Sequence, residues 1–280
     1  TYLFKKWSGG SMIIAGLGQA GKNIAKLFSP HKNYKIIILD ENEGVKSRQS
    51  VEEYDEHPIS IPSKTLKNES EVILFVCGSG KIAGATLRVL EALSSLEMTV
   101  FYIAPDLEFC SREERLRHRV HFGVLQEYAR SGKIKNIILT SNKSLFSMIG
   151  AGPITSYYKK VNYHIYSLMQ NLLYCLHTDP EFGQIQNPRD ISRISTIGLG
   201  HLDTDEEKLL FPLDNVTETC YLYNIDEEDL DNDETVLPRI QERVRDNKSK
   251  DRETSYAIWK ASDENLFYSL HYTHFIQEDK

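Results

Sequence analysis

The chain has 280 residues and a mass of 32.2 kDa, enough for one large domain or two modest ones around a substantial core. Its 40% hydrophobic and 26% charged residues exclude wholesale disorder and fibrous architectures. A formal charge of −7 argues against general binding to nucleic-acid phosphates. No apolar run approaches the roughly 20 residues that span a bilayer, so we expect no direct membrane insertion.

Residues 11–152 alternate short apolar runs with helix-like segments, and we interpret them as a first domain. Buried strands that alternate with helices indicate an α/β fold with a parallel sheet covered on both faces. The predicted strands are Ser11–Ala15, Tyr34–Asp40, Glu71–Cys77, Met98–Ala104 and Lys135–Thr140, and the predicted helices are Lys22–Phe28, Ala83–Ser95 and Ser111–Ser131.

Residues 153–177 form one long predicted helix, because apolar side chains recur there at spacings of three and four. Residues 178–280 predict a smaller mixed domain. Its expected elements are the strands Thr196–Asp203, Glu218–Tyr223, Ser255–Ala261 and Leu266–His274 and a helix over Thr235–Arg243. The last two strands alternate like a half-exposed antiparallel pair, and the acidic run Asp226–Glu234 predicts a solvated loop.

The four cysteines lie far apart, without metal-ligand spacing. This usage predicts reduced thiols in a cytoplasmic protein and no metal site built from side chains.

A first glycine-rich segment, GLGQAG, follows the first predicted strand and precedes a helix. Such a segment offers backbone N–H groups and the positive end of a helix dipole to a phosphate. The candidate phosphate-binding residues are Gly16, Gly18, Gln19, Ala20 and Gly21. Asp40 comes nineteen residues after Gly21, where the dinucleotide fingerprint places an acid on a ribose hydroxyl. An NAD site and a tight turn without a ligand both remain open.

A second glycine-rich segment, GSGKIAG, follows the third predicted strand and also opens a helix. Two such segments at the carboxyl ends of one parallel sheet would face a common site, so a diphosphate or triphosphate would lie between them. The second set of candidates is Gly78, Ser79, Gly80, Lys81, Ile82, Ala83 and Gly84. Lys81 lacks the spacing of a Walker lysine.

In order and spacing these segments resemble the tubulin/FtsZ family over about 190 residues. GQAG at Gly18–Gly21, followed by KNI, is similar to the GQAGxQIG loop of tubulins, and GSGKIAGA stands where the family has GGGTGSG. MTVFYIAP and ITSYYKKVNYHIYSLMQNLL are similar to the family's next strand and to the start of its central helix. The resemblance implies a Rossmann-like GTPase domain, a long central helix and a smaller α+β activation domain.

The resemblance also implies a ligand, GTP or GDP with Mg²⁺ on the phosphates. Tyr158 stands where an aromatic ring stacks on guanine, and Asn162 stands where a side chain hydrogen-bonds the guanine edge. Asn142 stands at a base or ribose contact, and Glu114 and Arg115 are the candidates for further contacts of this kind.

Residues 185–190 read IQNPRD and stand where the family has an acidic loop that completes hydrolysis on the next subunit. The resemblance therefore implies that Asp190 and Asn187 are catalytic and that copies of the chain assemble head to tail, with a DNA-bound adaptor or viral cargo as candidate partners. A turn in which Asp190 caps a helix is the alternative.

Three departures from the family pattern bear on activity. Lys81 and Ile82 interrupt the second glycine signature, the stretch between Asp40 and Glu71 is short, and the loop at 185–190 is less acidic. The less acidic loop predicts slow or lost GTP hydrolysis. Two other functions remain open, an NAD-dependent oxidoreductase that uses GLGQAG and Asp40, and a scaffold of this fold without nucleotide binding.

Overall fold

The computed structural model describes residues 11–39, 61, 63–67, 69–204, 206–261 and 265–278. Their contacts divide them into two compact units, residues 11–168 and residues 169–277. The helix α8 (Ile154–His177) begins in the first unit and ends in the second. The domain limits expected from the sequence, 11–152, 153–177 and 178–280, stay a prediction.

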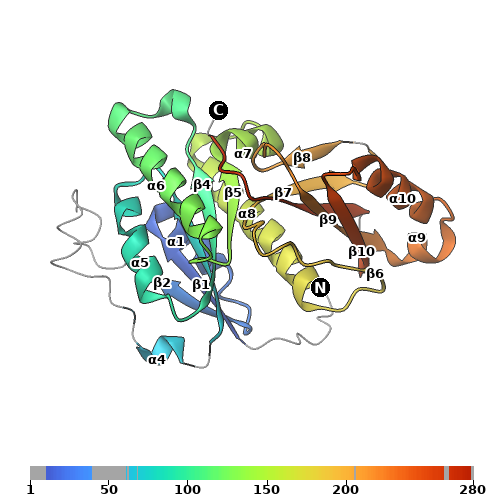
Figure 1. The fold of residues 1–280 in the computed structure, drawn as a ribbon, viewed down its shortest axis with the longest axis horizontal. Coiled ribbons are helices and arrows are strands. Elements are labelled where there is room, and N and C mark those ends of the chain that lie inside the picture. Colours follow the sequence, from blue (N-terminus) through green and yellow to red (C-terminus); the bar gives the residue numbers. More distant parts are fainter. Residues whose placement is uncertain are drawn as a thin grey trace. The chain divides into compact units, whose positions relative to one another are not determined.

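The first unit contains a five-stranded parallel sheet in the order β2-β1-β3-β4-β5 (Figure 1). Its strands are β1 (Met12–Leu17), β2 (Tyr34–Ile38), β3 (Glu71–Cys77), β4 (Glu97–Ala104) and β5 (Asn136–Ser141). All five correspond to apolar runs in the sequence, and most of their side chains are buried. The predicted parallel α/β sheet is therefore confirmed.

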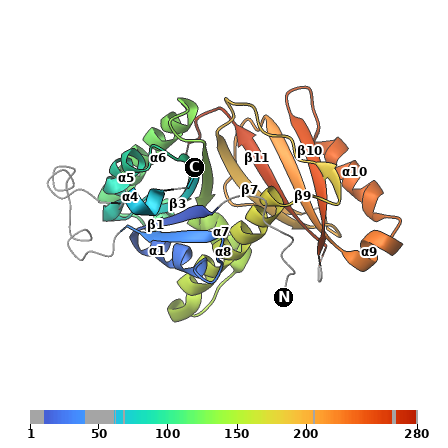
Figure 2. The same cartoon turned by 90° about the horizontal axis from the view of Figure 1, so that it is seen from below.

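Helices cover both faces of this sheet. The helical segments of this unit are α1 (Gly18–Leu27), α4 (Ser63–Leu66), the 3₁₀ helix η1 (Lys81–Ala85), α5 (Thr86–Ala92), the 3₁₀ helix η2 (Leu107–Phe109), α6 (Arg112–Arg130) and α7 (Asn142–Ile149). Helix α1 lies on one face and α5 and α6 on the other (Figure 2). The chain moves across the sheet in opposite directions after β1 and after β3, so right-handed crossovers place the helices on opposite faces.

The first half of α8 packs on the same face as α1. The ring of Tyr166 lies 4.9 Å from the ring of Phe28, and its hydroxyl is 2.7 Å from Nε2 of His31. The end of α1 is thereby joined to α8 by both an aromatic contact and a hydrogen bond.

The second unit contains a mixed sheet in the order β7-β11-β9-β10-β6, with β8 beside β7. Its strands are β6 (Phe182–Gln184), β7 (Ile194–His201), β8 (Glu207–Leu209), β9 (Glu218–Asp226), β10 (Glu253–Ala261) and β11 (Leu266–Thr273). The expected antiparallel pairing of the last two strands is wrong. β11 pairs with β7 and β9, whereas β10 lies on the far side of β9 and runs parallel to it.

The acidic run after β9 is helical, contrary to the expected loop. It forms α9 (Glu227–Asn232), where the Asp226 side chain caps the first turn by accepting a hydrogen bond from the N–H of Glu228. Glu227, Glu228 and Asp229 occupy that turn, where carboxylates interact favourably with the helix dipole. The charge run therefore stabilises a helix start.

Helix α10 (Val236–Asn247) provides the crossover that makes β9 and β10 parallel. Its Val236 and Ile240 pack into a buried cluster with aromatic side chains of the sheet, Tyr221, Tyr223 and Phe267. This apolar contact holds α10 on one face of the sheet of the second unit.

Candidate nucleotide site and catalytic turn

The first glycine-rich segment contains no loop, because β1 continues through Leu17 and α1 begins at Gly18. A Cβ added to Gly16 would overlap the carbonyl of Gly21, and a Cβ added to Gly21 would overlap the carbonyl of Phe75 in β3. Gly18 has φ +75°, a conformation that other residues rarely adopt. The glycines thus allow α1 to start directly above β1 and β3.

Among the residues that the structure describes, no side chain caps the amino end of α1. Leu17 is its N-cap and supplies no side-chain hydrogen bond, and the first turn contains no acidic residue. Gln19 is exposed and donates from its amide to Oδ1 of Asn23, 3.3 Å away. The first N–H groups of α1 therefore lack a side-chain cap, which is the arrangement that binds phosphates at helix starts.

The second glycine-rich segment lies beside the first. β1 and β3 are neighbours, with Leu17 opposite Val76, so both segments leave the same edge of the sheet. A Cβ added to Gly18 would lie 2.8 Å from Cγ2 of Ile82. The structure therefore brings the two predicted phosphate segments together, and the Ile82 side chain occupies space next to Gly18.

Side chains of α6 and β4 contact the second glycine-rich segment. The Tyr102 hydroxyl and Nδ1 of His118 are 2.9 Å apart, and a Cβ on Gly78 would overlap both groups. Arg117 donates from Nε to the carbonyl of Ser79 across 3.3 Å. The sequence analysis missed these supports, although three basic or imidazole side chains at positions 117, 118 and 121 follow one face of the predicted helix.

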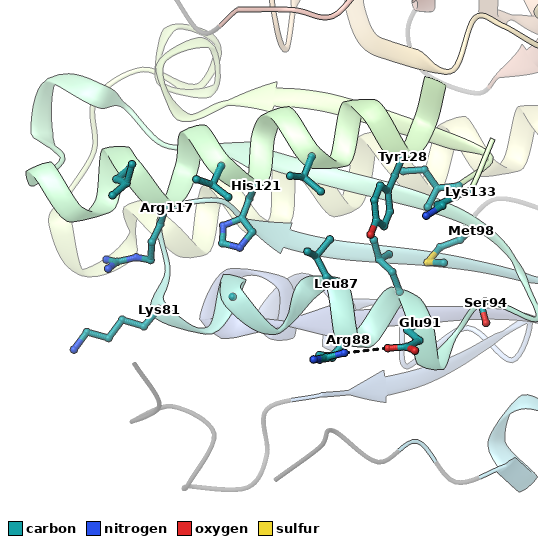
Figure 3. A pocket seen from close by; sticks show the side chains of 16 residues that line it. Lys81, Leu87, Arg88, Glu91, Ser94, Met98, Arg117, His121, Tyr128 and Lys133 are labelled. Atoms are coloured by element: carbon teal, nitrogen blue, oxygen red, sulfur yellow. Dashed lines mark hydrogen bonds and ion pairs between the residues drawn. The ribbon is translucent and has the colours of Figure 1, made fainter. Parts of the chain in front are cut away.

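A groove of about 840 Å³ runs between α5 and α6, next to the second segment (Figure 3). Lys81 and Arg117 extend from one end of it, and Lys133 lies at the other end (Figure 3). Burial lowers the pKa of His121, which lines the groove, so this imidazole is neutral near pH 7. His121 therefore adds no positive charge to the groove at neutral pH.

The predicted base-binding residues lie on α7 and α8. Asn142 is half-buried at the first position of α7, after Ser141, whose Oγ accepts a hydrogen bond from the N–H of Ser144. The rings of Phe146 and Tyr157 are 5.9 Å apart and hold the two helices together. Tyr158 is 68% exposed and Asn162 is 8% exposed, one helical turn apart. An exposed ring is suited to stacking on a base.

Glu114 and Arg115 have local roles at the start of α6. The Glu114 carboxylate accepts a hydrogen bond of 2.8 Å from the N–H of Ser111, which completes a capping box. Arg115 donates from Nε to the carbonyl of Cys110 across 3.0 Å. Their contact with a base or ribose stays a prediction.

The predicted catalytic segment lies in the second unit, and both Asn187 and Asp190 are exposed there. Asp190 is part of a turn in which the N–H of Ser192 donates to the carbonyl of Arg189 across 2.8 Å. The turn leads into β7, so the alternative in which Asp190 caps a helix is wrong.

No protein-family profile matches the chain, and no curated protein sequence does. Solved structures do. FtsZ of M. jannaschii, from an empty dimer, is 13% identical with a TM-score of 0.64, over 95% of this chain and 89% of that chain. TubZ of Bacillus thuringiensis serovar israelensis, in a GTPγS-form protofilament, is 14% identical with a TM-score of 0.67, over 94% of this chain and 86% of that one. CetZ2 of Haloferax volcanii, a GTPγS-bound protofilament, is 11% identical with a TM-score of 0.65, over 94% and 92%.

This chain has the tubulin/FtsZ fold. The likeness was found by comparing structures, and it agrees with the resemblance that the sequence segments indicated. At such low identity it establishes the architecture alone, and the chemistry of the site depends on this chain's own residues.

In this tubulin/FtsZ fold the part of the chain that the structure describes holds no group of three or more His, Cys, Asp or Glu side chains that could bind a metal. Among the same described residues no helix is long and apolar enough to cross a membrane.

All four cysteines are free thiols. Burial raises the pKa of Cys175 to about 12 and that of Cys220 to about 11, so both are protonated and unreactive at neutral pH. Cys77 and Cys110 are half-buried, and the reduced state of the thiols stays a prediction.

Proposed function

We propose that this protein binds GTP or GDP in its first unit, hydrolyses GTP slowly, and assembles head to tail into filaments. The observation that carries the proposal is the meeting of two glycine-rich segments at the carboxyl edge of neighbouring parallel strands, beside the uncapped start of α1. The fold supports it, because structures of this fold include GTPγS-bound protofilaments of TubZ and CetZ2.

In this proposal the phosphates lie on the N–H groups of the first turn of α1, with Gly18 and Gly21 keeping the backbone close. Residues 78–84 approach from β3, and the positive charge of Lys81 balances part of the phosphate charge. Mg²⁺, when bound, would neutralise further charge on the phosphate oxygens.

The base is assigned to α7 and α8. Tyr158 offers an exposed ring for stacking, and Asn162 offers a side-chain oxygen to the N–H groups on the edge of guanine. Adenine lacks those donors, so the contact favours GTP over ATP. Asn142, at the start of α7, is placed on the base or ribose.

Hydrolysis is assigned to the turn of a neighbouring copy. The Asp190 carboxylate would orient and polarise a water molecule for attack on the γ-phosphate, and Asn187 would add a polar contact. Both side chains are exposed, as a contribution to another subunit requires. A head-to-tail contact of this kind uses two different surfaces and generates an open filament. A DNA-bound adaptor or viral cargo would attach to such a filament.

The decisive experiment is the rate of GTP hydrolysis against protein concentration in the presence of Mg²⁺. We expect turnover per subunit to vanish below a threshold concentration, because the active site is complete only in the polymer. Hydrolysis proportional to protein at every concentration would show a site complete within one chain, and no hydrolysis at any concentration would reject the enzymatic part of the proposal.

Two alternatives make different predictions for the nucleotide that remains bound to the purified protein. An NAD-dependent oxidoreductase would retain NAD, and its ribose-binding candidate, Asp40, lies outside the described residues. A scaffold would retain nothing, and the Ile82 side chain beside Gly18 is the observation that favours it. We expect guanine nucleotide in a chromatographic analysis of the denatured sample.

A further inference from the structure

One buried carboxylate holds the turn that presents Asp190. Glu218, at the start of β9, is 7% exposed although it is acidic. Its Oε2 accepts a hydrogen bond of 2.7 Å from the backbone N–H of Arg189. Its Oε1 accepts from Nε of Arg189 and from Oγ of Ser192, each also across 2.7 Å. Both ends of the turn are therefore tied to a single side chain.

These contacts fix the residues on either side of Asp190. The turn closes through the hydrogen bond from Ser192 N–H to Arg189 C=O, and Nε of Arg193 donates to the Asp190 carbonyl across 2.6 Å. The backbone of Asp190 is thus restrained on both sides while its carboxylate stays exposed. Such restraint is what a catalytic group needs, because a displacement of about 1 Å can cost about 100-fold in rate.

The segment before the turn also packs closely on the sheet. The N–H of Gln186 donates to Oγ of Ser255 across 3.4 Å. A cavity of only about 20 Å³ remains between residues 186–188 and the strands, space for about one water molecule. The whole segment that carries Asn187 and Asp190 therefore rests on β9 and β10, with Glu218 as its most connected anchor.

We infer that Glu218 is a positioning residue for hydrolysis, which orders the turn so that Asp190 is presented to the nucleotide of the next subunit. The inference rests on the proposed function. Glu218 acts through the turn, because its carboxylate accepts hydrogen bonds from Arg189 and Ser192. Its carboxylate is suited to this role because both oxygens accept, and three donors of the turn converge on them in addition to Oγ1 of Thr217.

The variant Glu218→Gln tests the inference with little change in volume. An amide has one oxygen and one NH₂ group, and the orientation that keeps the two hydrogen bonds at the Oε1 position turns the NH₂ group toward the N–H of Arg189. We expect hydrogen exchange at the Arg189 amide to become about tenfold faster, since one hydrogen bond is lost. We expect kcat for GTP to fall at least about tenfold, while KM and the Kd of GTP change by less than about twofold.

Glu253→Gln is the matched control. Glu253 lies opposite Glu218 in the pairing of β9 with β10 and lines the same small cavity, yet no hydrogen bond joins it to the turn. It should leave both exchange and kcat unchanged. If Glu218→Gln folds poorly, Ser192→Ala removes one of the three donors and should shift exchange and kcat in the same direction by a smaller factor.

The outcomes are separable. Unchanged exchange in Glu218→Gln, or faster exchange with unchanged kcat, overturns the positioning role. Equal losses with Glu253→Gln overturn it as well, since they would report a general effect of charge. If the parent protein hydrolyses no GTP at any concentration, the proposed function fails, and the exchange experiment still decides whether Glu218 orders the turn.

Discussion

The two units of the molecule would handle a nucleotide by different means. In the first unit the candidate contacts are mostly backbone N–H groups, brought into place by glycines and a parallel sheet. In the second unit the candidate group is one exposed side chain on a turn, held by a buried carboxylate. Backbone groups are placed by the fold itself, whereas a side chain on a turn needs a separate anchor. Mutations in the first unit should therefore affect folding and binding, and mutations in the second should affect turnover.

The largest effect is expected from Gly21→Ala. The added methyl group would overlap the Phe75 carbonyl, which belongs to the backbone of β3 and cannot rotate away. We expect the free energy of unfolding to fall by about 3 kcal/mol, measured by chemical denaturation. Gly123→Ala is the control, because nothing lies within 4 Å of its added Cβ and alanine is the better helix former. Equal stability of the two variants would show that α1 sits farther from β3.

Asp190→Ala should slow GTP turnover by about 100-fold or more, the usual contribution of a positioned acid or base. The Kd of GTP should stay the same, because the assigned phosphate and base contacts belong to the first unit. Stopped-flow binding and phosphate release measure the two quantities. Asp251→Ala removes another exposed carboxylate of the second unit and should change neither quantity. Parent-like turnover in Asp190→Ala would remove Asp190 from the catalytic role.

Asn162→Ala should reduce the preference for GTP over ATP by about tenfold, since a good polar contact to a base edge contributes about 1–3 kcal/mol of discrimination. Competition binding with the two nucleotides measures the ratio. Asn162→Asp keeps an acceptor for the guanine N–H groups and should retain the preference. An unchanged ratio in Asn162→Ala would mean that Asn162, which is 8% exposed, serves packing alone.

Gly80→Ala should have the smallest effect on folding. Its φ of −64° suits any residue, and the nearest atom to an added Cβ is 3.7 Å away. We expect stability within about 0.5 kcal/mol of the parent, as for most unstrained surface changes. The Kd of GTP is the informative readout. A marked weakening would show that phosphate approaches Gly80 closely, whereas no change would mean that the first segment carries most of the binding.

The sequence predicted most of the first unit because its signals are local. Five apolar runs alternate with helical segments, and this pattern leaves a parallel sheet as the arrangement that buries every strand. The spacing of Gly16, Gly18 and Gly21 indicated the junction of β1 with α1. A side chain at position 16 or 21 would overlap the neighbouring backbone, and position 18 has a positive φ that favours glycine. The prediction missed the helices α4 and α7, and β1 is longer than expected and leads into α1 without a loop.

The topology of the second unit could not be read from the chain in the same way. Strands β10 and β11 alternate like a hairpin and are separated by a short connection, which favoured a mutual pairing. The fold instead inserts β11 between β7 and β9, where six of the eight residues of β11 are buried. Whether β11 pairs with the strand before it in sequence or with more distant strands depends on how much apolar surface the whole sheet buries. A local sequence pattern carries no information about that total.

By itself the sequence determined the alternating strands and helices of the first unit and the two glycine-rich segments, and its resemblance to the family pointed to Asp190. Only the tertiary structure decided that Ile82 lies against Gly18, that Arg117 supports Ser79, and that Glu218 anchors the turn of Asp190. The reason is physical. Apolar periodicity and glycine spacing act between near neighbours in the chain. A buried carboxylate needs hydrogen-bond donors around it, and the donors of the turn that Glu218 contacts, Arg189 and Ser192, lie 29 and 26 residues away in sequence.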